Sequence, residues 1–179
     1  MTGEPITPSD PEHSGPERTG PEHTPDGHFI IVDGRRWRAT DPDIPEALRA
    51  ELVKELMAAR RLVKSRGDAA RVRVQDAKVA LGERGDPWWE PTEQGRRDRL
   101  AAAMRTLLRQ RGEDRTICPS DAARVVGGED WRDLMPVARE VAGTLAEEGV
   151  VVVTRKGAAV DVATARGPVR IAAGPALET

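Results

Sequence analysis

The residues of this chain that are best suited to chemistry are basic side chains near its C-terminal end. Arg132 and Arg139 are seven residues apart, so in a helix they lie on one outer line. Further basic residues follow at Arg155, Lys156, Arg166 and Arg170. Guanidinium and ammonium groups bind phosphates and the edges of bases. We therefore predict that these side chains are the candidate nucleic-acid contacts.

Carboxylates run beside the two helical arginines. Asp133, Glu140 and Glu147 are spaced seven residues apart, and the expected helix carries no asparagine or glutamine. These acids would repel a phosphate backbone. Residues 96–173 hold fourteen basic and eleven acidic residues, which is only a weakly basic balance.

Two hypotheses for this surface stay open, and the basic residues between 155 and 170 slightly favour the first. In the first, it binds duplex DNA, with Arg132 and Arg139 in the major groove and the later basic residues on phosphates. In the second, its mixed charges bind a complementary protein partner. A continuous positive face would favour DNA, whereas acids that interrupt it would favour a protein.

The residue types that enzymes need are sparse. All three histidines lie in the first 28 residues, so residues 96–173 cannot form a Ser–His or Cys–His pair. No glycine-rich phosphate loop is present. Cys118 has two interpretations, a reactive thiol near a helix start or a small buried apolar group. We predict a protein without enzymatic activity, without a cofactor and without a metal site.

Composition indicates the cellular compartment in which the protein is expected. The chain has 179 residues, is 38% hydrophobic and has a formal net charge of -2. No apolar run approaches the roughly 20 residues that span a bilayer. The N-terminal stretch "MTGEPITPSDPEHSG" has no apolar segment typical of a secretion signal. These features, with a single cysteine, predict a soluble cytoplasmic protein without a membrane partner.

The chain divides into segments of different composition, and each segment predicts its own helices and strands. Residues 1–27 are acidic and rich in proline, glutamate, histidine and glycine, which predicts a disordered tail. Residues 28–95 predict a β-hairpin turning at Asp33-Gly34, followed by two antiparallel helices broken at Gly67. Residues 174–179 are a second tail. The predicted fold class is mainly α with small β elements (α+β).

Residues 96–173 predict a winged helix-turn-helix domain. Its expected order is helix, short strand, helix, turn, helix, strand, wing and strand. Ser120 is expected to cap the second helix, and Gly127-Gly128 to end it. A long third helix is expected from about residue 129 to 148, with Pro136 kinking it or splitting off its first turn. Trp131 is expected to be a structural residue between the second and third helices.

Two aromatic phrases, "GRRWR" and "PWW", have two interpretations. Aromatic rings and arginines together can form a nucleic-acid surface, because rings stack on bases. Alternatively, Trp37, Trp88 and Trp89 cover the helical hairpin, which has few other large apolar groups. We favour the second interpretation, because so small a unit needs these rings for its core.

Several phrases of the C-terminal part occur together and in order. They are "ICPSDAARVVGGEDWRDLMPVARE", "VTRKG" and "DVATARGPVRI". Residues 96–172 resemble the bacterial domain of unknown function 3253 family, which is winged-helix-like. "VDGRRWRATDP" and "VQDAKVALGERGDPWWEP" resemble a segment that precedes this domain in some members. The resemblance implies the fold and supplies no catalytic residues.

Overall fold

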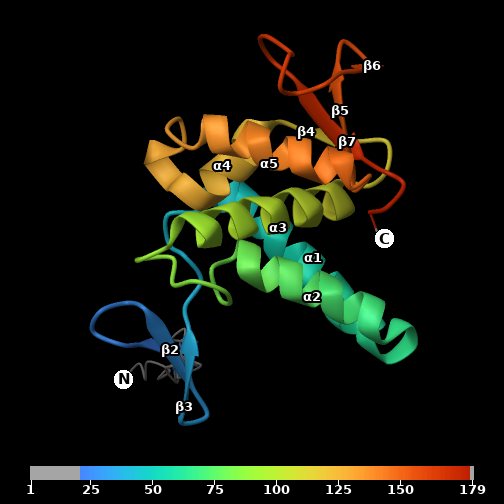
Figure 1. Ribbon diagram of the computed structural model, residues 1–179. Coiled ribbons are helices and arrows are strands. Elements are labelled where there is room, and N and C mark those ends of the chain that lie inside the picture. The colour runs from blue at the N-terminus through green and yellow to red at the C-terminus, as the bar shows by residue number, and fades with distance from the viewer. Residues whose placement is uncertain (1–20, 178–179) are drawn as a thin grey trace, which may run out of the picture.

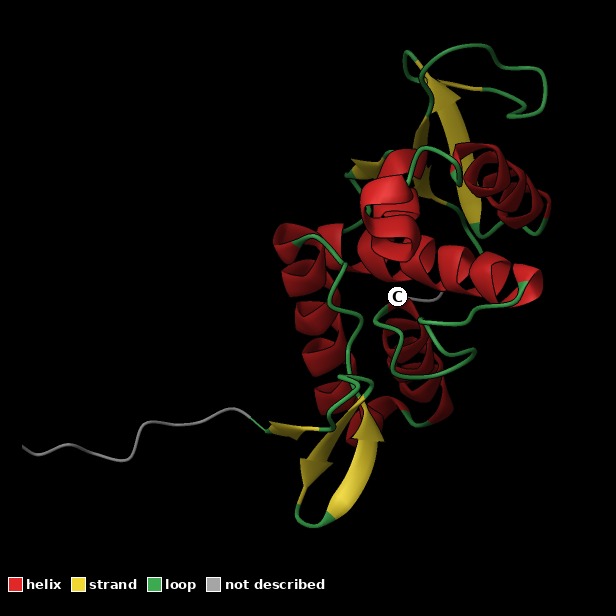
Figure 2. Cartoon of the chain, turned by 90° about the vertical axis from the view of Figure 1, so that its left-hand side faces the viewer, coloured by secondary structure: helices red, strands yellow, loops and turns green. Residues whose placement is uncertain are grey.

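The computed structural model describes residues 21–177 of the chain. Its helices are α1 (Glu46–Arg66), α2 (Asp68–Ala80), α3 (Glu93–Arg111), α4 (Pro119–Gly127), the short 3₁₀ helix η1 (Gly128–Asp130) and α5 (Met135–Glu147). Its strands are β1 (Glu22–His23), β2 (Phe29–Val32), β3 (Arg35–Arg38), β4 (Thr116–Ile117), β5 (Val151–Arg155), β6 (Ala158–Ala159) and β7 (Arg170–Ala173). Helices packed together and flanked by two small antiparallel sheets confirm the α+β fold class (Figures 1 and 2).

The first sheet has the strand order β1-β2-β3 and projects from the helices (Figure 1). Asp33 and Gly34 have φ angles of 51° and 70°, which are the left-handed conformations that a tight hairpin turn of the expected kind requires. The predicted boundary of the N-terminal tail at residue 27 is wrong. Glu22 and His23 pair with Ile31 and Ile30, so the sheet begins before this boundary.

Local hydrogen bonds explain why an acidic, proline-rich stretch joins the sheet. The Asp26 carboxylate accepts from the His28 amide at 3.0 Å, and the Thr24 amide donates to the Phe29 carbonyl at 2.9 Å. These bonds form a side-chain-assisted turn that composition alone conceals. The predicted disorder of residues 1–20 lies outside the described residues.

The two helices α1 and α2 run antiparallel and pack side by side (Figure 1). The chain reverses at Gly67, whose φ of 56° suits a residue without a side chain. This is the predicted helical hairpin. Its outer end is basic, because residues 60–73 contain six basic residues and one acid.

The C-terminal part follows the predicted order α3, β4, α4, turn, α5, β5 and β7, with β6 in the last loop. Strand β7 lies between β4 and β5, so residues distant in sequence close this sheet. Gly128, with a φ of 50°, ends α4 as predicted. Gly127 packs closely against α5, because a Cβ there would lie 2.8 Å from a methyl carbon of Leu134 and would displace that side chain.

Two predicted helix starts are wrong. Ser120 does not cap α4, which begins at Pro119 with Cys118 as its cap residue. Proline is favoured at the first helical position, and the Asp121 carboxylate accepts from the Cys118 amide at 3.0 Å. The third helix does not begin near residue 129. Pro136 lies in the first turn of α5, where its missing N–H costs nothing. The separate η1 and a turn precede it, so of the two expected effects of Pro136 the split-off first turn is the one observed.

The C-terminal tail predicted from residue 174 is also wrong up to residue 177. The Gly174 amide donates to the Val150 carbonyl at 2.9 Å, and the Ala176 amide donates to the Gly149 carbonyl at 3.0 Å. The Leu177 side chain is buried in the core. The buried Leu177 side chain therefore anchors a short segment that was predicted to be a tail outside the domain.

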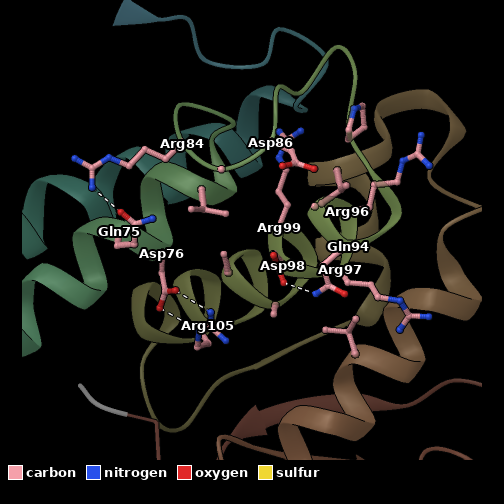
Figure 3. Close-up of a pocket in the computed structure, with 18 of the residues that line it drawn as sticks. Gln75, Asp76, Arg84, Asp86, Gln94, Arg96, Arg97, Asp98, Arg99 and Arg105 are labelled. Atoms are coloured by element: carbon pink, nitrogen blue, oxygen red, sulfur yellow. Dashed lines mark hydrogen bonds and ion pairs between the residues drawn. The ribbon is translucent and has the colours of Figure 1, made fainter.

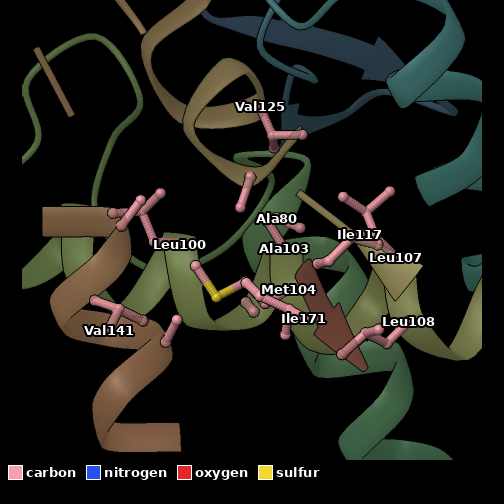
Figure 4. Close-up of a cluster of buried hydrophobic side chains, with 14 of the residues drawn as sticks. Ala80, Leu100, Ala103, Met104, Leu107, Leu108, Ile117, Val125, Val141 and Ile171 are labelled. Atoms are coloured by element: carbon pink, nitrogen blue, oxygen red, sulfur yellow. The ribbon is translucent and has the colours of Figure 1, made fainter. Parts of the chain in front are cut away.

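One hydrophobic core holds the two predicted segments 28–95 and 96–173 together. Helix α3 lies at its centre, with Met104 and Leu107 fully buried between the other helices and the second sheet (Figure 4). Leu52 of α1 and Ile171 of β7 belong to the same cluster. The helical hairpin and the C-terminal elements therefore bury their apolar faces against each other.

A buried ion pair reinforces this junction. The Arg99 guanidinium lies 2.7 Å from the Asp41 carboxylate and donates to the carbonyls of Ala80 and Val125. Burial lowers the pKa of Arg99, and the charge of Asp41 opposes that shift. Nearby, Arg111 joins Glu51 of α1 to Asp121 of α4.

Candidate binding surface

The loop between β5 and β7, residues 156–169, folds over the outer face of α5. Val162 in this loop is buried, and its Cγ1 atom lies 3.0 Å from the position that a Cβ on Gly143 would occupy. Gly143 therefore allows the loop to approach the helix closely. The helix face that the DNA hypothesis requires is partly covered by this β5–β7 loop.

Arg139 is the residue that fastens the loop. Its guanidinium donates to the carbonyl oxygens of Val162 at 3.1 Å, Ala165 at 2.5 Å and Gly167 at 3.3 Å. These bonds use three of the five guanidinium N–H donors and so leave fewer for a base or a phosphate. The structure thus places Arg139 on the predicted outer line of the helix but directs its charge into the protein's own loop.

Arg132 lies beside Trp131 in the turn before α5. The Arg132 and Arg124 guanidinium carbons lie 4.7 Å and 4.6 Å from the centre of the Trp131 rings. Trp131 is half-buried and packs against the core. Both arginines remain exposed.

The remaining predicted basic residues lie on the second sheet and its loop. Arg155 and Lys156 stand at the turn between β5 and β6 and are exposed, as is Arg166. Arg170 donates to the side chain and the carbonyl of Thr116, both at 2.9 Å, and so ties β7 to β4. Within residues 21–177, Arg155, Lys156 and Arg166 have no recorded hydrogen bond or ion pair.

A groove of about 950 Å³ lies between α5 and the β5–β7 loop. Apolar groups line it, including the side chains of Met135, Pro136, Ala146, Val160 and Ala163. Its carboxylates are Glu140, Glu147 and Asp161. Glu140 is paired with Arg97 at 2.6 Å, and the Arg139 guanidinium is bound to the loop. The charged groups that remain for a ligand of the groove are therefore the carboxylates of Glu147 and Asp161.

A second cavity of about 680 Å³ lies over α3, between α2, α5 and the loop that precedes α3 (Figure 3). Many arginines line it, but several are already partnered: Arg105 binds Asp76 at 2.9 Å, and Arg84 donates to Gln75 at 2.5 Å. Among the described residues, no buried side-chain nitrogen or oxygen lacks a hydrogen-bond partner. The buried polar side chains of the cavity wall are therefore already partnered within the protein.

The tryptophans divide between the two interpretations of the sequence. Trp88 donates from Nε1 to the Ala39 carbonyl at 3.2 Å, and Trp89 stacks on the His28 ring at 3.9 Å. Both therefore cover the junction between the first sheet and the helices. Trp37 does not, because 49% of its surface is exposed. Its predicted role in the core is wrong, since it is exposed and, among the described residues, makes no ring contact with Trp88 or Trp89.

Cys118 is half-buried at the start of α4. No helix within the described part of the chain is long and apolar enough to cross a membrane.

Comparison with known proteins finds a family match for the C-terminal part of the chain. A search among curated proteins finds no match. Residues 97–174, from α3 to the end of β7, match the family described as "Protein of unknown function (DUF3253)". The groove, the β5–β7 loop and the predicted basic residues all lie within this match. Over these residues the chain is therefore similar to the DUF3253 family, as the sequence resemblance predicted.

Proposed function

We propose that residues 97–174 form a winged-helix domain that binds a protein partner and has no enzymatic activity. The order of helices and strands supports the winged-helix assignment, with α5 as the third helix and the β5–β7 loop as the wing. The observation that carries the proposal is the Arg139 contact. Its three bonds hold the guanidinium group against the β5–β7 loop, which partly covers the helix face.

The chemistry of the groove defines the partner. Apolar groups from Met135 and Val160 offer contacts for apolar side chains, while Glu147 and Asp161 favour a positive charge. A protein segment that carries apolar residues and neighbouring arginines or lysines fits this arrangement. The same acids would repel the phosphates of a DNA duplex approaching α5.

Duplex DNA is the second candidate, and the exposed basic residues of the loop favour it. Arg155, Lys156 and Arg166 have no recorded partner within residues 21–177, so they are available to phosphates. In this alternative the loop supplies the affinity and α5 contributes little base recognition.

A peptide selection against the immobilised full chain tests the proposal. Selected peptides should combine apolar and basic residues, and calorimetry should find weaker binding to the Glu147→Lys variant. Glu129→Lys is the matched control, because Glu129 is exposed and lies outside the groove. Equal binding by both variants and the native chain would reject the groove as the site.

Fluorescence anisotropy with random-sequence duplex DNA at low salt tests the alternative. If the loop binds phosphates, changing Arg155 and Lys156 to Ala should reduce the slope of log affinity against log salt by about 2. Duplex binding with this salt dependence would favour the DNA hypothesis if the selection also yields no peptide whose binding depends on Glu147.

A further inference from the structure

The first sheet carries an exposed aromatic and basic surface that the C-terminal groove does not explain. The hairpin of β2 and β3 projects away from the helices (Figures 1 and 2). Trp37 of β3 is 49% exposed, and Val32 of β2 is 40% exposed. Large apolar side chains left in water on a projecting element commonly mark a binding site.

The strand register assigns these side chains to one face of the sheet. Trp37 pairs with Ile30, and Arg35 pairs with Val32. Paired residues share a face, and side chains alternate along a strand, so all four lie on the same side. His23, the partner of Ile30 in β1, completes this face. Among the described strand residues, the face contains no carboxylate.

The three arginines of β3 have different surroundings. Arg38 donates to the carbonyls of Gly85 and Asp86 at 2.7 Å and 3.2 Å, which anchors the hairpin to the loop before α3. The Arg35 guanidinium carbon lies 5.7 Å from the ring centre of Trp37. Arg36, on the opposite face, lies 4.3 Å from the ring centre of Phe29. Two exposed guanidinium groups are therefore held beside aromatic rings.

We propose that this hairpin binds single-stranded nucleic acid, with the Trp37 ring stacking on a base and Arg35, on the same face, contacting a phosphate. An exposed ring with adjacent guanidinium groups is the combination that holds single strands without reading their sequence. A duplex hides the faces of its bases from such a ring. A second copy of this hairpin is a poor occupant, because edge strand β3 would place arginines against arginines.

The test is fluorescence anisotropy of the full chain with a short labelled oligonucleotide of mixed sequence, as single-stranded DNA and as single-stranded RNA. Trp37→Ala should weaken binding at least about fivefold, because it removes one stacked base. Trp37→Phe should retain most of the affinity. Changing Arg35 to Ala should reduce the salt slope by about 0.7, the value for one phosphate contact on a single strand.

The matched control is Arg61→Ala, which removes the same charge from an exposed position on α1, outside both proposed surfaces. It should leave single-strand binding within twofold of the native chain, with circular dichroism checking that every variant is folded. Three results would overturn the proposal: no binding of single strands at low salt, equal losses in the hairpin and control variants, or selection of acidic peptides but no oligonucleotide. The groove proposal would be unaffected by any of these results, because its variants lie on α5.

Discussion

Arg139 is a residue whose position suggests a ligand contact while its hydrogen bonds serve the fold. Its three acceptors belong to the β5–β7 loop, so removing the side chain leaves half-buried carbonyls without a charged donor. We expect Arg139→Ala to lower the free energy of unfolding by about 1.5–3 kcal/mol. Hydrogen exchange should also become faster in residues 161–167.

Arg166→Ala is the control for this prediction. Arg166 is exposed in the same loop, so its loss should change stability by no more than about 0.5 kcal/mol. If Arg139→Ala proves equally neutral and loop exchange is unchanged, the loop does not depend on this arginine.

Trp131 tests how strongly the turn before α5 depends on stacked charges. A buried tryptophan changed to alanine costs about 3–5 kcal/mol. Trp131 is only half-buried between Arg124 and Arg132, so we expect Trp131→Ala to cost about 1–2 kcal/mol. Chemical denaturation measures this cost. A value in the range for a buried tryptophan would show that core packing, and not the arginines, dominates at this position.

Among the elements, the start of α3 depends on a carboxylate outside the helix. The side chain of Thr92 caps α3 by accepting from the Gly95 amide at 3.0 Å, and Asp86 accepts from the Thr92 hydroxyl and amide. These bonds hold the pKa of Asp86 below its ordinary value of 3.8. Gly95 is required here, because a Cβ would lie 2.1 Å from the Asp86 Oδ2 atom.

A pH series tests this arrangement. A lowered pKa means that the Asp86 carboxylate stabilises the folded state above pH 3.8, and that this contribution is lost as the pH falls through the lowered pKa. The Tm difference between the native chain and Asp86→Asn should therefore be constant near neutral pH and shrink under acid. Glu90→Gln, at a nearby exposed position, should give no such change. A constant difference for Asp86→Asn at every pH would contradict the prediction.

At the scale of the whole molecule, the shared core and the Arg99–Asp41 pair predict one cooperative unfolding transition. Asp41→Ala would leave a buried guanidinium without its counter-charge, and we expect a loss of about 3–5 kcal/mol. Asp68→Ala breaks an exposed pair with Arg71 and should cost less than about 1 kcal/mol. Calorimetry distinguishes these outcomes. Two separate transitions in the native chain would show that residues 28–95 and 96–173 fold independently.

The sequence by itself determined the features that depend on neighbours along the chain. Asp33-Gly34 specifies a turn with positive φ angles, Gly67 breaks a pair of helices, and Gly127-Gly128 ends α4, because each effect is a local backbone preference. The alternation of helices and strands also predicted the order of elements. The start of α4 was missed, although Pro119 and Asp121 carry the signal that locates it.

Only the tertiary structure decided which contacts the arginine and tryptophan side chains make. Arg139 and Arg132 have similar positions on the helical pattern, yet one binds three carbonyls of a distant loop and the other stacks on Trp131. Trp37 and Trp88 are both aromatic residues beside turns, yet one is exposed and the other is packed on the body. Periodicity gives the direction in which a side chain leaves its own element. What meets it there depends on segments far away in the sequence, whose placement is fixed by the common core.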